Sequence, residues 1–64
     1  MIEIGALIKI KIDFKLSRSL AIREGDYGIV IGYAEEESCA VFDYLVVCNG
    51  IQIYLFKYEV ELIT

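Results

Sequence analysis

The stretch that decides the fold runs from Cys39 to Phe56 and reads CAVFDYLVVCNGIQIYLF. Two apolar runs flank Asn49 and Gly50, a pair that favours a two-residue hairpin turn because both central residues of a type I′ turn take positive φ. Such a turn fixes the register of the two strands. The predicted cross-strand pairs are Cys48 with Ile51, Val46 with Ile53, Tyr44 with Leu55, and Phe42 with Lys57.

The register divides the hairpin into two faces, because successive strand residues point to opposite sides. The predicted core face consists of Phe42, Tyr44, Val46, Cys48, Ile51, Ile53 and Leu55. The other set, called here the outer hairpin face, consists of Val41, Asp43, Leu45, Val47, Gln52, Tyr54 and Phe56. Polar tips among bulky apolar groups are typical of a contact surface rather than of a solvated one. The alternative is that residues 16–26 or the curl of a barrel cover this face as ordinary core.

The composition indicates one all-β domain spanning residues 1–64. Hydrophobic residues make up 58% of the chain, and Ile and Val, which suit a pleated surface, account for a quarter of it. No apolar run reaches the roughly 18 residues of a membrane span, and we expect a cytoplasmic protein with no membrane partner. Cys39 and Cys48 lie nine positions apart on one predicted strand, roughly 30 Å, so we expect reduced thiols rather than a disulfide.

Four further elements complete the expected fold. Ile8 to Lys15 alternates apolar and polar residues and predicts one strand, and Gly28 to Tyr33 predicts another, with glycines where a backbone approaches or the strand bends. Residues 16–26 form an excursion, either a single helical turn or a loop that carries Leu20 and Ile22 inward. After a polar turn at 35–38 and the hairpin, one 3₁₀ turn at 57–59 precedes a closing strand at 60–63. The pattern predicts a small five-stranded barrel or two orthogonally packed sheets.

This order of elements resembles the Src-homology-3-like (SH3-like) barrel across nearly the whole chain. Arg23-Glu24-Gly25-Asp26 is similar to the segment that opens the second strand of that family, and Asn49-Gly50 occupies its distal turn. The segment from Leu55 to Ile63 is similar to the family's closing segment, although one residue shorter and without its proline. The resemblance implies a five-stranded SH3-like barrel with a short 3₁₀ turn before the last strand.

The chain departs from the peptide-binding members of that family. The Ala-Leu-Tyr-Asp-Tyr run, the tryptophan and the proline that line the polyproline groove are all absent, so no proline-rich ligand is expected. The segments 25–30 and 43–47 and the closing Glu61-Leu62-Ile63 are most similar to small barrel proteins of tailed phages, including those of marine cyanobacteria. This likeness implies a virus-encoded accessory or virion component, in the host cytoplasm or in the particle.

Side chains suited to catalysis are scarce. Histidine is absent, which excludes an imidazole base or ligand, and we expect no enzyme and no cofactor. Asp26 could act as a general base, but an aspartate that bonds its own turn is the favoured interpretation. Glu35, Glu36 and Glu37 could hold a divalent cation, but consecutive side chains diverge, so a solvated turn is favoured and no metal is predicted.

Two surfaces remain as candidate sites. The favoured hypothesis is a binding or structural module that contacts another protein, or a second copy of itself, through the outer hairpin face. The alternative is RNA or DNA binding through a basic stripe consisting of Lys9, Lys11, Lys15, Arg18 and Arg23. Cross-strand pairing of these cations with Glu59 and Glu61 is the simpler interpretation, because the net charge is −4. Charge is uneven: residues 1–23 carry five bases against two acids (+3), and residues 24–64 carry one base against eight acids (−7).

Overall fold

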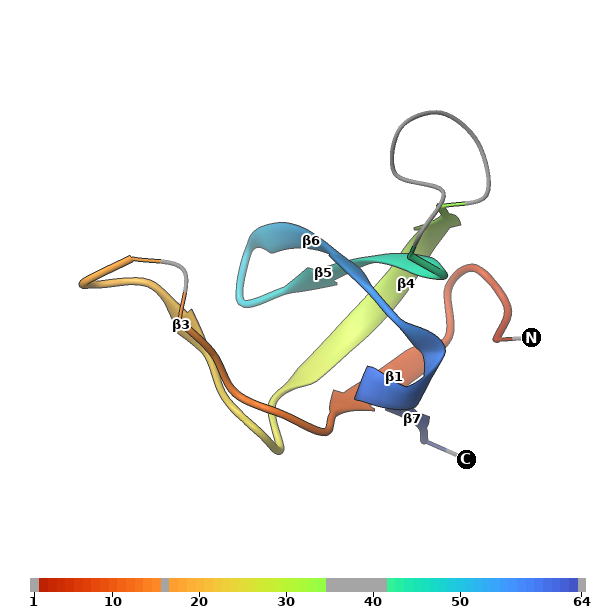
Figure 1. Cartoon of the computed structure of the whole chain (residues 1–64). Coiled ribbons are helices and arrows are strands. Elements are labelled where there is room, and N and C mark those ends of the chain that lie inside the picture. Colours follow the sequence, from red (N-terminus) through yellow and green to blue (C-terminus); the bar gives the residue numbers. More distant parts are fainter. Residues whose placement is uncertain (1, 16, 35–41, 64) are drawn as a thin grey trace.

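A computed structural model describes residues 2–15, 17–34 and 42–63, and most of these residues lie in strands (Figure 1). The elements are β1 (Leu7–Ile10), β2 (Phe14–Lys15), β3 (Ala21–Ile22), β4 (Tyr27–Tyr33), β5 (Tyr44–Cys48), β6 (Ile51–Leu55), the 3₁₀ turn η2 (Lys57–Glu59) and β7 (Val60–Leu62). Five strands form one antiparallel sheet in the order β6-β5-β4-β1-β7, and β2 pairs with β3 in a separate sheet. The prediction of a small all-β domain is confirmed. Strand pairing among the described residues leaves β6 and β7 as the sheet edges.

The predicted hairpin is confirmed over β5 and β6. Asn49 and Gly50 take φ of 53° and 76°, as a type I′ turn requires. The cross-strand partners are Tyr44 with Leu55, Leu45 with Tyr54, Val46 with Ile53, Val47 with Gln52, and Cys48 with Ile51.

The predicted pair of Phe42 with Lys57 is wrong. The strand begins only at Tyr44, and the Lys57 N–H donates to a carboxylate oxygen of Asp43 at 2.7 Å, which turns the chain into η2 instead of prolonging the ladder. Phe42 is half-buried and its ring packs against Phe56, so it contacts the outer face instead of the core face. The start of the predicted hairpin, residues 39–41, lies outside the described residues.

The predicted strand from Ile8 to Lys15 is two strands. The chain leaves the main sheet after Ile10, whose N–H donates to the Asp26 carbonyl and whose carbonyl accepts from the Gly25 N–H. Ile12 lies at the break and is 42% exposed, although its place in the alternation predicted burial. The chain then forms β2 and β3, which pair Phe14 with Ile22 and Lys15 with Ala21. The alternation of apolar and polar residues therefore continues past Ile10, although backbone hydrogen bonds bend the chain there.

The excursion predicted at 16–26 contains β3, which pairs with β2 directly before it, so the chain forms a two-stranded projection here; Leu16 itself lies outside the described residues. We call residues 13–23 the arm. Ile22 is buried as predicted, whereas Leu20 at the tip is 50% exposed. A hydrogen bond from the Glu24 N–H to the Asp13 carboxylate, 2.7 Å, closes the base of the arm. In Figure 1 the arm extends to the left of the main sheet.

Strand β4 contains both predicted glycines. A Cβ on Gly28 would stand 2.8 Å from Val46 Cγ1, which confirms the close approach of a neighbouring strand. Between Val30, which pairs with Val46, and Gly32, which pairs with Leu45, the register shifts by one residue, so Ile31 forms a β-bulge.

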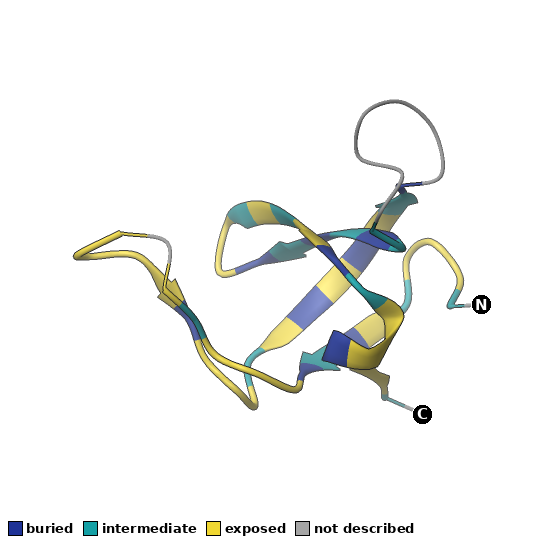
Figure 2. Ribbon diagram, viewed as in Figure 1, coloured by how far each residue is buried: buried dark blue, intermediate teal, exposed yellow. Residues whose placement is uncertain are grey.

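Exposed and buried residues alternate from Tyr27 to Ile31 along β4 (Figure 2), so one face of this strand contributes to the core. The buried apolar cluster consists of Ile8, Ile10, Ile22, Val30, Tyr44, Val46, Cys48, Leu55 and Val60. Four of the seven predicted core residues of the hairpin belong to it, and Ile51 and Ile53 pack against its margin.

Two tyrosines hold the segment that precedes β1. The Ile2 N–H donates to the Tyr44 hydroxyl at 3.1 Å, and the Tyr33 hydroxyl donates to the Ile2 carbonyl at 2.8 Å. The two rings pack 6.0 Å apart. Both hydroxyls are thereby satisfied where they are partly buried.

No helix among the described residues is long and apolar enough to cross a membrane.

Candidate functional site

The outer hairpin face is only partly covered. Leu45 and Val47 on β5 are half-buried, as are Asp43 and Phe56 at the two ends of the hairpin. On β6, Gln52 is exposed and Tyr54 is 40% exposed. Val41, the remaining residue of the predicted surface, lies outside the described residues. The outer hairpin face stays open to solvent at Gln52 and Tyr54, so the arm does not enclose it.

Four aromatic rings lie side by side at the end of this face. Phe42 and Phe56 have ring centroids 4.7 Å apart, Phe42 and Tyr54 6.0 Å, and Phe56 and Tyr58 5.2 Å with ring planes only 7° apart. We call these four residues the aromatic row. Tyr58 is 65% exposed, the highest value among the large apolar and aromatic side chains of the described part. The row therefore presents ring surface to solvent at Tyr54 and Tyr58.

Two carboxylates fix the backbone that carries the row. Asp43 accepts the Lys57 N–H, and Glu59 accepts the Phe56 N–H at 2.8 Å while its own N–H donates to the Phe56 carbonyl at 3.0 Å. Glu59 is 8% exposed, so this contact is largely shielded from water. These bonds hold the one-turn η2 in place, which brings Tyr58 against Phe56.

Sequence reasoning missed two members of the row. Tyr54 and Phe56 follow directly from the hairpin register, but Phe42 was assigned to the core and Tyr58 to no surface. The available signal for Tyr58 was the 3₁₀ turn predicted at 57–59, because such a turn directly after the hairpin keeps Tyr58 close to Phe56. For Phe42 the signal was Asp43, a residue that favours a turn over a strand interior.

The five residues of the basic stripe do not form one surface. Lys9 and Lys11 line a pocket of about 420 Å³ together with Glu24 and Glu61, and Lys9 is directly opposite Glu61 in the register of β1 and β7. The Lys9 ammonium also lies 5.7 Å from the centroid of the Tyr27 ring. Lys9 on β1 is thus cross-strand from Glu61, as the simpler interpretation predicted, and Lys11 lies after β1 in the same carboxylate-lined pocket.

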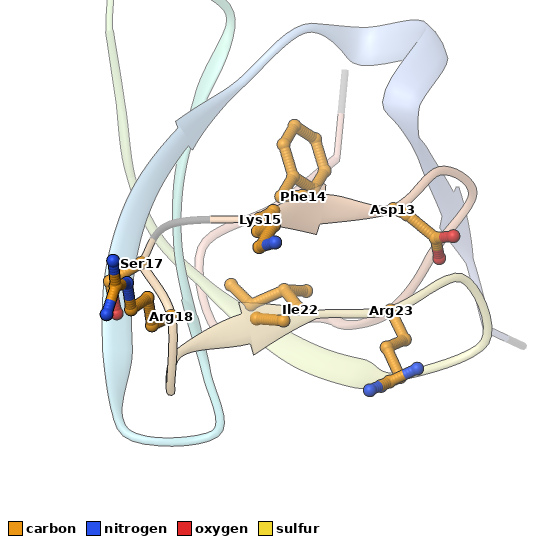
Figure 3. Close-up of a pocket in the computed structure, with 8 residues that line it drawn as sticks. Asp13, Phe14, Lys15, Ser17, Arg18, Ile22 and Arg23 are labelled. Carbon is orange, nitrogen blue, oxygen red and sulfur yellow. The ribbon is translucent and has the colours of Figure 1, made fainter.

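The other three cations gather on the arm. Lys15, Arg18 and Arg23 line a second pocket, of about 380 Å³, whose apolar wall includes Phe14 and Ile22 (Figure 3). In that view Arg18 lies beside Ser17 at the tip, whereas Arg23 and Asp13 lie at the opposite end. The arm therefore carries a net positive charge around an open, partly apolar hollow.

The residues weighed for catalysis have structural partners. Asp26 accepts hydrogen bonds from the Arg23 N–H at 2.9 Å and from the Asn49 side-chain amide at 3.0 Å, so the prediction that it bonds its own turn is confirmed. Cys48 is buried, and burial, with a smaller contribution from the charge of Asp26, raises the pKa of its thiol. A thiol with a raised pKa is a poor nucleophile.

The described residues contain no cluster of three or more potential metal ligands. Glu35, Glu36, Glu37 and Cys39 lie outside them. The two candidate surfaces on the described part are thus the aromatic row with its hairpin and the basic arm.

No protein-family model, curated protein or solved structure matches the chain. Its function is therefore inferred from these two surfaces.

Proposed function

We propose that this protein is a small, non-enzymatic binding module that associates with a second copy of itself through the outer hairpin face. The aromatic row carries the proposal. Exposed Tyr and Phe rings are the side chains that most often anchor protein interfaces, because each buries a large area at a small cost in conformational entropy. Here the rings also pack against one another, so little side-chain freedom remains to be lost on binding.

We further propose that the fold is an SH3-like barrel. The strand order β6-β5-β4-β1-β7, the excursion between β1 and β4, and the 3₁₀ turn before β7 support this assignment. The absence of the family's groove residues argues against proline-rich ligands. We also propose a role as a virus-encoded accessory or virion component, on the resemblance of segments 25–30 and 43–47 to tailed-phage barrel proteins.

Light scattering on a dilution series tests self-association. The wild-type protein is expected to gain mass with concentration, and Tyr54→Glu and Tyr58→Glu are expected to remain monomeric, because a carboxylate on the row cannot be buried without a partner. Tyr27→Glu is the matched control, since Tyr27 is an exposed tyrosine on β4 beside Lys9 and outside the row. Circular dichroism checks that each variant folds. A wild-type monomer at every concentration, or equal disruption by the control, would overturn the proposal.

A second candidate function is RNA or DNA binding by the arm. The specific observation is that Lys15, Arg18 and Arg23 line one pocket. Phosphate contacts weaken steeply with salt, so binding to a single-stranded or duplex oligonucleotide should be tightest at about 50 mM salt. No binding under that condition removes this candidate.

A further inference from the structure

The arm has the properties of a docking element. Residues 17–20 at its tip are all exposed, including Arg18 and the apolar Leu20. No ion pair within 4.0 Å involves Lys15, Arg18 or Arg23 among the described residues. Within the described part of the chain, the cations of the arm thus form no ion pair, and Leu20 at its tip is half exposed.

The aromatic row has the complementary properties. The faces of its rings carry negative electrostatic potential and attract a guanidinium group, which also stacks on them. The carboxylates of Asp43, half-buried, and Glu59, buried, lie beside the row and each accepts a backbone N–H, so the exposed ring faces are the main attraction for a cation; residues 24–64 together carry a charge of −7. Arginine is the cation best suited to such a surface, because its planar group is weakly hydrated and stacks.

The arm and η2 lie well apart in the fold (Figure 1). In Figure 1 the arm extends to the left, whereas η2, which carries Tyr58, lies at the right beside β7. An arm therefore does not contact the row of its own chain, and a second copy must supply it.

We propose that the arm of one copy docks on the aromatic row of a second copy, with Arg18 over the exposed tyrosine rings and Leu20 against the apolar part of the outer hairpin face. This inference rests on the self-association proposed above and names its geometry. Because the two surfaces differ, the contact is heterologous, and every added copy leaves one arm and one row unoccupied. Such contacts grow into open chains or close into rings, whereas row-to-row contact stops at a dimer.

Complementation between two variants tests this geometry. Arg18→Glu removes the docking cation and keeps the row, and Tyr58→Glu damages the row and keeps the arm. Each variant alone is expected to associate at least about tenfold more weakly than the wild type. An equimolar mixture is expected to form a one-to-one dimer and nothing larger, because only one intact pair of surfaces remains. Lys11→Glu, an equal change of charge at an exposed residue outside the arm, is the control and is expected to associate like the wild type.

The outcomes separate the two proposals. If Arg18→Glu associates like the wild type while Tyr58→Glu does not, self-association through the row stands and arm docking is overturned. If the mixture fails to form dimers although both variants are folded, the contact is not heterologous and arm docking is likewise overturned. If Arg18→Glu loses only oligonucleotide binding, the arm is a nucleic-acid surface instead. A wild-type monomer overturns both self-association and its geometry.

Discussion

At the residue scale, Gly28 has the tightest surroundings of the five glycines. A Cβ there would meet Val46 Cγ1 at 2.8 Å and the Val47 carbonyl oxygen at 2.9 Å, whereas at Gly32 the nearest atom, Leu45 Cβ, would lie 3.8 Å away. The carbonyl oxygen belongs to the backbone of β5, so it cannot move without disturbing the sheet.

Gly28→Ala is therefore expected to lower the free energy of unfolding by about 1 to 3 kcal/mol, the usual cost of overpacking. Gly32→Ala, on the same strand, is the control and is expected to change it by less than about 1 kcal/mol. Urea titrations followed by circular dichroism measure both values. Equal destabilisation by the two substitutions would show that the close approach of β5 is not the cause.

At the element scale, η2 depends on the side chain of Asp43. Its carboxylate accepts the Lys57 N–H at 2.7 Å, which is the contact that ends the hairpin and begins the turn. Without this carboxylate, the Lys57 N–H must hydrogen-bond to water, and η2 holds the Tyr58 ring less firmly against Phe56.

Asp43→Ala is expected to cost about 0.5 to 2 kcal/mol of stability, as the loss of a capping side chain does. It is also expected to weaken self-association, since the aromatic row becomes less ordered. Gln52→Ala, an exposed change on β6 within the same outer hairpin face, is the comparison. Thermal unfolding gives the first quantity and light scattering gives the second; an Asp43→Ala protein as stable as the Gln52→Ala protein would contradict the role assigned to the carboxylate.

Elements whose signal is local were predictable from the sequence. Asn49-Gly50 determines its own turn and with it the pairing of β5 with β6, and the 3₁₀ turn at 57–59 was found as well. The break after Ile10 could not be predicted from the sequence, because it depends on hydrogen bonds to Gly25 and Asp26, which lie far along the chain. Alternation alone could not show that Ile12 lies outside the sheet.

At the scale of the whole molecule, the uneven charge distribution should make self-association depend on salt concentration. Residues 1–23 and 24–64 differ in sign, and the arm and the aromatic row belong to these opposite halves. Self-association is therefore expected to weaken as salt rises from about 50 mM to about 500 mM, since screening shortens the range of the attraction below about 5 Å. Sedimentation equilibrium at each salt concentration measures the strength of self-association. Association that is unchanged or stronger at high salt would indicate purely apolar contact.

The candidate site was predictable only in part for a related reason. Tyr54 and Phe56 follow from the hairpin register, but the row is completed by Phe42 and Tyr58, which hydrogen bonds across the fold bring into place. Likewise, a count of charges found the basic residues, but only the fold separates Lys9 and Lys11 from the three cations of the arm.

The bulge at Ile31 has a consequence for the segment before β1. Side chains of a strand alternate between its two faces, and one bulged residue reverses this alternation for all the residues that follow. Val30 and Tyr33 are three positions apart, yet both pair with inward-facing partners, Val46 and Tyr44. If β4 paired with β5 without the bulge, Ile31 would lie opposite Leu45 and Gly32 opposite Tyr44, and Tyr33 would face outward, so its hydroxyl would no longer reach the Ile2 carbonyl. The bulge in β4 thus keeps Tyr33 oriented to hold the segment before β1 against the sheet.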